Sequence, residues 1–168
     1  QHSSNHERWR GYLQALREAG LPLHDELVKL GTTRSTWGAM AASELLRLMD
    51  PPTALFVASN AIMPGVMRCL RQRGLRLPAE MSLICFDDID WFSYSMPPIT
   101  AIRTAHNRRA EAAVDLLFRR MQFGTEAEVP PSFVEISFEL VLRESTAPAR
   151  QGRLTLRDEE AHPAHEPA

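Results

Sequence analysis

Short, mostly apolar runs alternate along the chain with longer stretches in which apolar residues recur every three or four positions. Thr53–Ala58 and Met81–Phe86 are the clearest of these runs, and they are typical of strands buried on both faces of a sheet. Ile99–Arg103 is a further candidate strand, and Ser132–Arg143 contains the last strand pattern. Glu26–Leu30 is a weaker candidate.

The stretches between these runs have helical periodicity. The third predicted helix carries Pro64, which a helix tolerates only in its first turn, and the fourth extends over His106–Gln122. The expected inward faces are Trp9, Tyr12, Leu13 and Leu16 in the first helix, Trp37, Met40, Ala41, Leu45 and Leu48 in the second, and Ile62, Val66, Cys69 and Leu70 in the third. The fourth helix has an apolar stripe of Ala110, Val114, Leu117, Phe118 and Met121. Strands that alternate with helices predict an α/β fold with a mostly parallel, Rossmann-like sheet and flanking helices.

Composition narrows the possible classes of protein. A net charge of −2 and 44% hydrophobic residues are typical of one globular unit and give no electrostatic footprint for nucleic acid. No apolar run approaches the roughly 20 residues that span a bilayer, and Gln1–Arg10 lacks a signal-peptide core. Cys69 and Cys85 are expected to be buried structural thiols, so we predict a soluble, cytoplasmic protein without a metal or cofactor.

The central strand run stops abruptly at two carboxylates, Asp87 and Asp88, which are followed by a loop rich in aromatic residues. In open parallel sheets, ligands bind at the carboxyl ends of the strands, where the loops leave. Consecutive residues of a strand point to opposite faces, so one acid should face the ligand and the other should face away. We assign Asp87 to a small-molecule site and Asp88 to the opposite side.

Several segments resemble the effector-binding core of LacI/GalR-family transcriptional repressors. These segments are Glu7-Arg8-Trp9-Arg10-Gly11-Tyr12, Pro52-Thr53-Ala54-Leu55-Phe56-Val57-Ala58, Gly74-Leu75-Arg76-Leu77-Pro78, Phe86-Asp87-Asp88 and Pro97-Pro98-Ile99-Thr100-Ala101-Ile102-Arg103. Their order and spacing over Ser4–Ser145 make the match specific. The family's core looks like a periplasmic sugar-binding protein of type I, with two Rossmann-like lobes around a ligand cleft and an N-terminal helix-turn-helix that binds DNA.

The resemblance covers only the later part of that core, so the chain looks like an N-terminally truncated regulator. It implies that residues 1–103 form an incomplete C-terminal lobe and that residues 104–137 are the returning part of the N-terminal lobe. The apolar stripe of the fourth helix would then lack most of its packing partners. Residues 138–145 would be a final strand back to the C-terminal lobe, and 146–168 a mobile tail, because Pro, Ala, Glu, Arg and His dominate there. Operator DNA would then be bound only through a segment that precedes this chain.

The resemblance also implies site residues. Arg8 matches an arginine that clamps effector hydroxyls or a carboxylate, and Asp87 matches the acid that accepts hydrogen bonds from effector hydroxyls. The remaining predicted contacts to a sugar or nucleoside effector are Thr33, Ser59, Asn60 and Thr104. Ser59 and Asn60 are equally well explained as N-cap residues of the following helix. A homodimer face would include Pro64, Arg68, Tyr94 and Met96.

Two alternatives remain open at this stage. Asp88-Ile89-Asp90 after a hydrophobic strand resembles the nucleophile motif of haloacid-dehalogenase-like phosphatases, but those enzymes need a downstream lysine and the only lysine here is Lys29. A periplasmic sugar-binding protein of a transporter shares the fold and would require an export signal. Arg108, Arg109, Arg119 and Arg120 are expected to form a solvated helix face.

Overall fold

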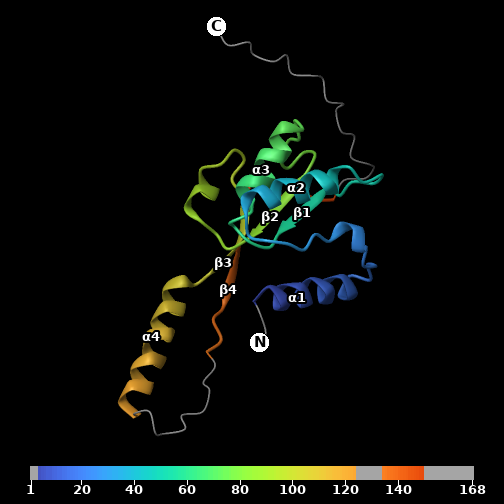
Figure 1. Cartoon of the computed structure of the whole chain (residues 1–168). Helices are drawn as coiled ribbons and strands as arrows, with labels where there is room; N and C mark the ends of the chain where they lie inside the picture. Colours follow the sequence, from blue (N-terminus) through green and yellow to red (C-terminus); the bar gives the residue numbers. More distant parts are fainter. Residues whose placement is uncertain (1–3, 124–133, 150–168) are drawn as a thin grey trace.

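The computed structural model describes residues 4–123 and 134–149 of the chain. Its elements follow in the order α1 (Ser4–Glu18), η1 (Asp25–Leu27), α2 (Ser35–Leu46), β1 (Ala54–Val57), α3 (Met63–Gln72), β2 (Ser82–Phe86), η2 (Asp90–Ser93), β3 (Thr100–Thr104), α4 (His106–Phe123) and β4 (Phe138–Val141). The helices and strands alternate along the chain as the periodicity predicted (Figure 1).

The four strands of the described residues form one sheet in the order β1-β2-β3-β4. β1, β2 and β3 are parallel, and β4 returns antiparallel to β3. Val57 pairs with Cys85, so the residues that follow β1 and β2 leave the sheet at the same edge. The predicted mostly parallel α/β fold is confirmed.

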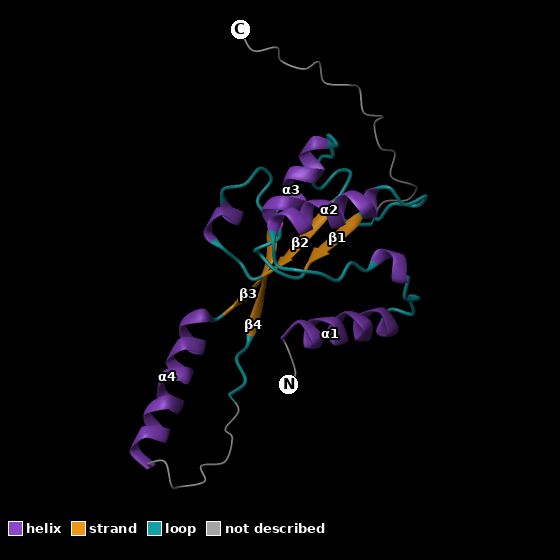
Figure 2. Ribbon diagram, viewed as in Figure 1, coloured by secondary structure: helices purple, strands orange, loops and turns teal. Residues whose placement is uncertain are grey.

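The core lies between the sheet and the pair of helices α2 and α3 (Figure 2). Leu46, Leu70 and Met63 from the helices meet Leu83 and Cys85 from β2, and all five are almost completely buried. Helix α1 lies on the other side of the sheet (Figure 1). Cys69 and Cys85 are free thiols inside this core, where burial raises the pKa of each, as expected for structural thiols.

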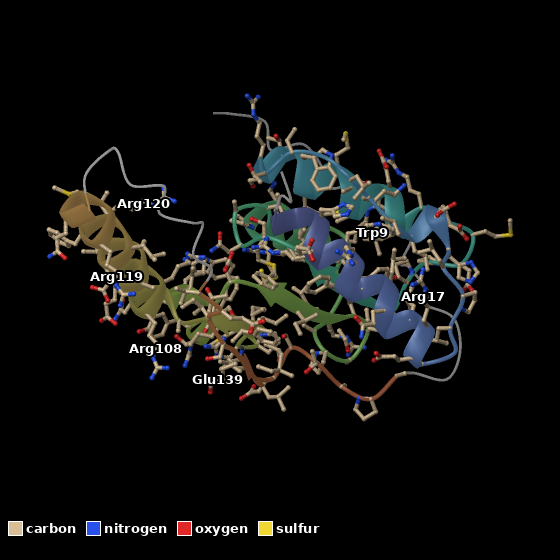
Figure 3. All side chains as sticks on the ribbon, turned by 90° about the horizontal axis from the view of Figure 1, so that it is seen from below. Trp9, Arg17, Arg108, Arg119, Arg120 and Glu139 are labelled. Atoms are coloured by element: carbon tan, nitrogen blue, oxygen red, sulfur yellow. The ribbon has the colours of Figure 1, made fainter. Side chains whose placement is uncertain are left out.

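Helix α4 and strand β4 point away from this core (Figure 2). The apolar stripe of α4 is therefore exposed, as expected for a helix without its packing partners. The exposed apolar side chains of this region are Val114, Leu117, Phe118 and Met121 in α4, and Phe138, Leu140 and Leu142 in and after β4. The arginines of α4 are exposed too, and Figure 3 shows Arg108, Arg119 and Arg120 spread along the helix.

Two local predictions are wrong. Glu26–Leu30 is not a strand: the amide of Val28 donates to the carbonyl of Asp25 at 3.0 Å, which closes a single turn of 3-10 helix. A strand needs a partner, and within the described part of the chain the sheet ends at β1. Met40 is 52% exposed because the buried stripe of α2 (Gly38, Ala41, Ala42, Leu45 and Leu46) is centred on the neighbouring face.

Hydrogen bonds hold Ser145 and Ala147 to the sheet. The side chain of Ser145 is completely buried, accepts a hydrogen bond from the amide of Thr100 at 2.8 Å and donates one to the carbonyl of Leu83. Ala147 follows it and exchanges hydrogen bonds with Ser82. Small hydroxyl side chains can bridge backbone groups inside a sheet, which composition does not reveal. Residues 150–168 and the first two residues of the predicted segment Ser132–Arg143 lie outside the described residues.

Candidate functional site

Asp87 stands at the point where β2 ends and the chain turns. Its backbone φ is +68°, a left-handed conformation that Asp and Asn adopt more readily than other residues with side chains. This turn stops the β2–β3 ladder at the pair Phe86 and Ile102. The Asp87 side chain is 20% exposed, so it is sheltered but still open to a small molecule.

Arg8 reaches this edge from α1. Its Nη1 donates to the carbonyl oxygen of Ala58 at 2.6 Å, just beyond the end of β1. The guanidinium lies 3.8 Å from the centroid of the Phe86 ring, a distance typical of a cation–π contact. Its Nη2 stands 3.8 Å from Oδ2 of Asp87. Contacts with Ala58 and Phe86 therefore hold the guanidinium of Arg8 beside the carboxylate of Asp87.

Thr104, the last residue of β3, completes the group. Its hydroxyl donates to Oδ1 of Asp87 at 3.3 Å. Arg8, Asp87 and Thr104 thus come together at the carboxyl edge of the sheet, although they lie far apart in the sequence. A guanidinium supplies fixed donors and a carboxylate supplies only acceptors, a combination that binds hydroxyl groups from two sides.

The other three predicted effector contacts, Ser59, Asn60 and Thr33, lie in the loops after β1 and before α2. Ser59 and Asn60 follow β1 and leave the sheet at the edge where Asp87 stands. They are not the N-cap pair of α3, because the cap residue is Ile62 and no side chain caps the helix. The Ser59 hydroxyl instead accepts from the amide of Ala61 at 3.4 Å. Thr33 is exposed in the loop before α2, and among the described residues no hydrogen bond joins it to the group.

Asp88 faces the other way, as the alternation along a strand predicted. Its carboxylate accepts two hydrogen bonds at 2.8 Å from the guanidinium of Arg143, and Arg103 donates to its Oδ2 through Nη2 and Nε at 2.8 and 3.0 Å. Burial opposes the charge on Asp88, but the hydrogen bonds from Arg143 and Arg103 outweigh it and lower the pKa of the carboxyl. The Asp88 side chain is only 6% exposed.

Sequence reasoning missed Arg143, which lies 55 residues from Asp88. Its role depends on the antiparallel return of β4, for which the sequence near Asp88 gives no signal. Beside this ion-pair cluster lies an open hollow of about 540 Å³, which Arg103, Thr104 and Arg108 line together with residues of the loop after β2. Thr104 belongs to both the hollow and the Arg8–Asp87 group, whereas neither Arg8 nor Asp87 lines the hollow.

The cluster around Asp88 predicts a dependence of stability on pH. Folding lowers the pKa of Asp88, so this carboxyl contributes stability above the ordinary Asp pKa of about 4, and the contribution is lost as the pH falls through the folded-state pKa. Urea unfolding from pH 7 to 3 measures the free energy of unfolding of the wild type and of Asp88→Asn. The difference between the two should be largest near neutrality and should become smaller below about pH 4. Asp90→Asn, which removes an exposed acid from the same loop, should show no such narrowing. A difference in unfolding free energy that stayed constant with pH would contradict the lowered pKa of Asp88.

The predicted dimer-face residues are exposed. Tyr94 is 81% and Met96 is 95% exposed in the loop that follows η2, and Pro64 and Arg68 lie on the outer side of α3. Within residues 4–123 and 134–149, no three side chains of His, Cys, Asp or Glu gather closely enough to hold a metal ion. No helix in the same part of the chain is long and apolar enough to cross a membrane.

Comparison with known proteins gives the family. Residues 1–146 match the family model described as a periplasmic binding protein-like domain. The HTH-type transcriptional repressor PurR of Actinobacillus pleuropneumoniae serotype 3 (strain JL03) is 34% identical over 139 residues, which are 83% of this chain and 41% of the repressor.

Two solved structures of LacI-family regulators have a similar fold. A putative LacI-family regulator of Sanguibacter keddieii aligns with a TM-score of 0.76 and 32% identity, over 82% of this chain and 52% of that one. A LacI-family regulator of Enterococcus faecium with bound ribose aligns with a TM-score of 0.70 and 28% identity, over 86% of this chain and 52% of that one. The chain spans about half or less of each of these proteins, and its similarity to them confirms the resemblance inferred from the sequence. The chain therefore belongs to the family of periplasmic binding protein-like domains, and its relatives are LacI-type transcriptional regulators.

Proposed function

We propose that the chain is the ligand-sensing part of a LacI-type transcriptional regulator and that it binds a small sugar-like effector between Arg8 and Asp87. The observation that carries this proposal is the meeting of the two side chains at the carboxyl edge of the sheet, with 3.8 Å between Nη2 and Oδ2. That separation is longer than a direct hydrogen bond, and a hydroxyl group that contacts both atoms satisfies donor and acceptor together. The relative from Enterococcus faecium was solved with ribose, which supports the sugar class.

The effector contacts divide by chemistry. Asp87 accepts hydrogen bonds from effector hydroxyls, and Arg8 donates to ring or hydroxyl oxygens or to a carboxylate. Thr104, Ser59 and Asn60 supply further polar groups at the same edge, and Thr33 would supply one from the loop before α2. A sugar and the ribose of a nucleoside present the same vicinal hydroxyls, so both classes fit this group.

The exposed surface of α4 and β4 supports the proposed division into lobes. Four apolar side chains of α4 and three in and after β4 stand in water, an apolar area of a kind that normally marks an interface. The related repressor is more than twice as long as the stretch that this chain matches. In the longer protein, residues 104–137 would belong to an N-terminal lobe whose other elements cover this surface.

Operator DNA and a second copy of the chain are the proposed macromolecular partners. Binding of effector would shift the balance between two lobe arrangements and so change the affinity for operator DNA, which a preceding segment contacts in the cytoplasm. The exposed side chains of Pro64, Arg68, Tyr94 and Met96 would form a homodimer face. Tyrosine and methionine are enriched in such faces, which supports the choice.

Neither alternative gains support from the site. Asp88, the nucleophile candidate of a phosphatase, is committed to Arg103 and Arg143, and Lys29 pairs with Glu44 at 3.1 Å. A transporter's binding protein shares the fold, but the named relatives in the comparisons are transcriptional regulators. The sensor of a regulator therefore remains the better account.

The test of the site uses Asp87→Asn, because asparagine keeps the size and tolerates the left-handed backbone while it removes the charge. The intact protein is screened by thermal shift against D-ribose, D-glucose, cellobiose, adenosine and uridine. A compound that stabilises the wild type should bind the variant roughly tenfold to a hundredfold more weakly, since a hydrogen bond to a charged group is lost.

Asp90→Asn is the matched control and should respond like the wild type. Equal responses of the wild type and Asp87→Asn would remove Asp87 from the site. A wild type that responds to no compound in the screen would contradict the proposed effector class.

A further inference from the structure

The strands β3 and β4 continue beyond the point where β2 stops supporting them. The β2–β3 ladder ends at the pair Phe86 and Ile102, whereas the β3–β4 ladder continues through Arg103 with Glu139 to Thr104 with Phe138. After Ile102 these strands form a two-stranded ribbon, and the ribbon leads directly into α4 (Figure 1). A ribbon that has lost its neighbouring strand is free to bend unless side chains hold it.

Two neighbouring acids take over where the backbone ladder ends. Asp87 accepts from the hydroxyl of Thr104, and Asp88 accepts from the guanidinium of Arg103. Asp88 also binds Arg143, which follows β4 and donates in addition to the carbonyl oxygen of Ile99 at 2.6 Å. Asp88 thereby joins the end of β2 to both chain segments that form the ribbon.

The two attachments differ in strength. Asp88 is 6% exposed and its four hydrogen bonds, between 2.8 and 3.0 Å, all join opposite charges. Charge-assisted and bidentate bonds of this kind are the strongest in proteins. Asp87 holds Thr104 by one bond of 3.3 Å to a neutral hydroxyl, on a carboxylate that is 20% exposed. A ligand hydroxyl can compete for Asp87, whereas Asp88 stays committed to its arginines.

We propose that Asp88 is a positioning residue that fixes the base of the β3–β4 ribbon to the sheet, so that a ligand at Asp87 acts on α4 only through Thr104. The second half of this statement rests on the effector site proposed above. Helix α4 begins two residues after Thr104, and an 18-residue helix is about 27 Å long. A small displacement at Thr104 is therefore enlarged at the far end of α4, provided that the base of the ribbon stays fixed.

The test measures amide hydrogen exchange in the intact protein, first without ligand. Asp88→Asn should speed exchange roughly tenfold in both 100–104 and 138–141, because Arg103 and Arg143 lose the carboxylate charge that they share. Exchange in Asp90→Asn should stay within about twofold of the wild type. If Asp88→Asn does not fold, Arg103→Gln leaves both bonds from Arg143 to Asp88 in place and should loosen residues 100–104 more than residues 138–141, where only the 3.7 Å ion pair of Arg103 with Glu139 is lost. Exchange at the wild-type rate in the variant that folds would overturn the proposal.

The second arm adds D-ribose at a saturating concentration. In the wild type, ligand-dependent changes around the ribbon should be confined to residues 104–109, and in Asp88→Asn they should spread into 138–141. Changes that reach β4 equally in the wild type would overturn the proposal. If D-ribose has no effect on any variant, the ribose response fails while the first arm still decides whether Asp88 fixes the ribbon.

Discussion

Replacement of Gly65 by alanine is expected to destabilise the fold more than most single substitutions. Gly65 lies in the first turn of α3, where this helix crosses α2 with the two backbones in contact. A Cβ atom at Gly65 would lie 1.7 Å from the carbonyl oxygen of Ser35 and 2.8 Å from the amide of Ala39. Both are backbone atoms, so no side chain can rotate away, and the helices must separate.

The expected loss is at least about 3 kcal/mol of unfolding free energy, at the upper end of what overpacking usually costs. Urea unfolding followed by circular dichroism measures it. Gly11→Ala is the matched control, because a Cβ at Gly11 in α1 meets nothing within 4 Å. That variant should gain up to about 1 kcal/mol from helix propensity. A Gly65→Ala protein as stable as the wild type would show that α2 and α3 do not cross in this way.

Phe92→Ala is the second substitution with a large expected effect. Phe92 is completely buried, packs edge-on against Trp91 at 4.6 Å between ring centroids, and accepts hydrogen bonds through its carbonyl from Ile99 and Ser95. Removal of a buried phenylalanine ring costs about 3–5 kcal/mol. The loop that presents Tyr94 and Met96 is anchored by this ring, so the proposed dimer should weaken as well.

Tyr94→Ala separates the two effects. This side chain is 81% exposed, and its removal should change the unfolding free energy by less than about 0.5 kcal/mol while it weakens the dimer. Sedimentation of the intact protein over a range of concentrations measures dissociation. A Tyr94→Ala protein that dimerises as tightly as the wild type would exclude this loop from the dimer face, and an undiminished stability of Phe92→Ala would contradict its role as the anchor.

Periodicity was sufficient to predict most of the fold. The apolar runs around Leu55 and Leu83 predicted β1 and β2, although β1 lies at the edge of the sheet and buries only one face, which leaves Phe56 40% exposed. The position of Asp87 followed from the abrupt end of the second run. Met40 and the segment Glu26–Leu30 were mispredicted for a common reason, since both depend on what the neighbouring elements cover and not on the local pattern.

Long-range polar contacts were beyond the reach of periodicity. Ser145 was predicted only as the last residue of the final strand segment, and nothing in its neighbourhood indicated that its hydroxyl joins two strands. Arg143 gave no sign of its partner Asp88, because an ion pair across 55 residues depends on the direction in which β4 returns. The meeting of Arg8 with Asp87 was expected from the family resemblance and not from the residues alone.

The buried hydroxyl of Ser145 also limits how far the chain can be shortened from its carboxyl end. The amide of Leu83 donates to the Ser145 carbonyl at 2.8 Å, so a truncation before this serine would leave backbone groups of β2 and β3 without partners inside the protein. Ala147 still exchanges hydrogen bonds with Ser82, so a chain that ends after this alanine keeps both sets of contacts. Fusion junctions and engineered protease sites belong beyond that alanine.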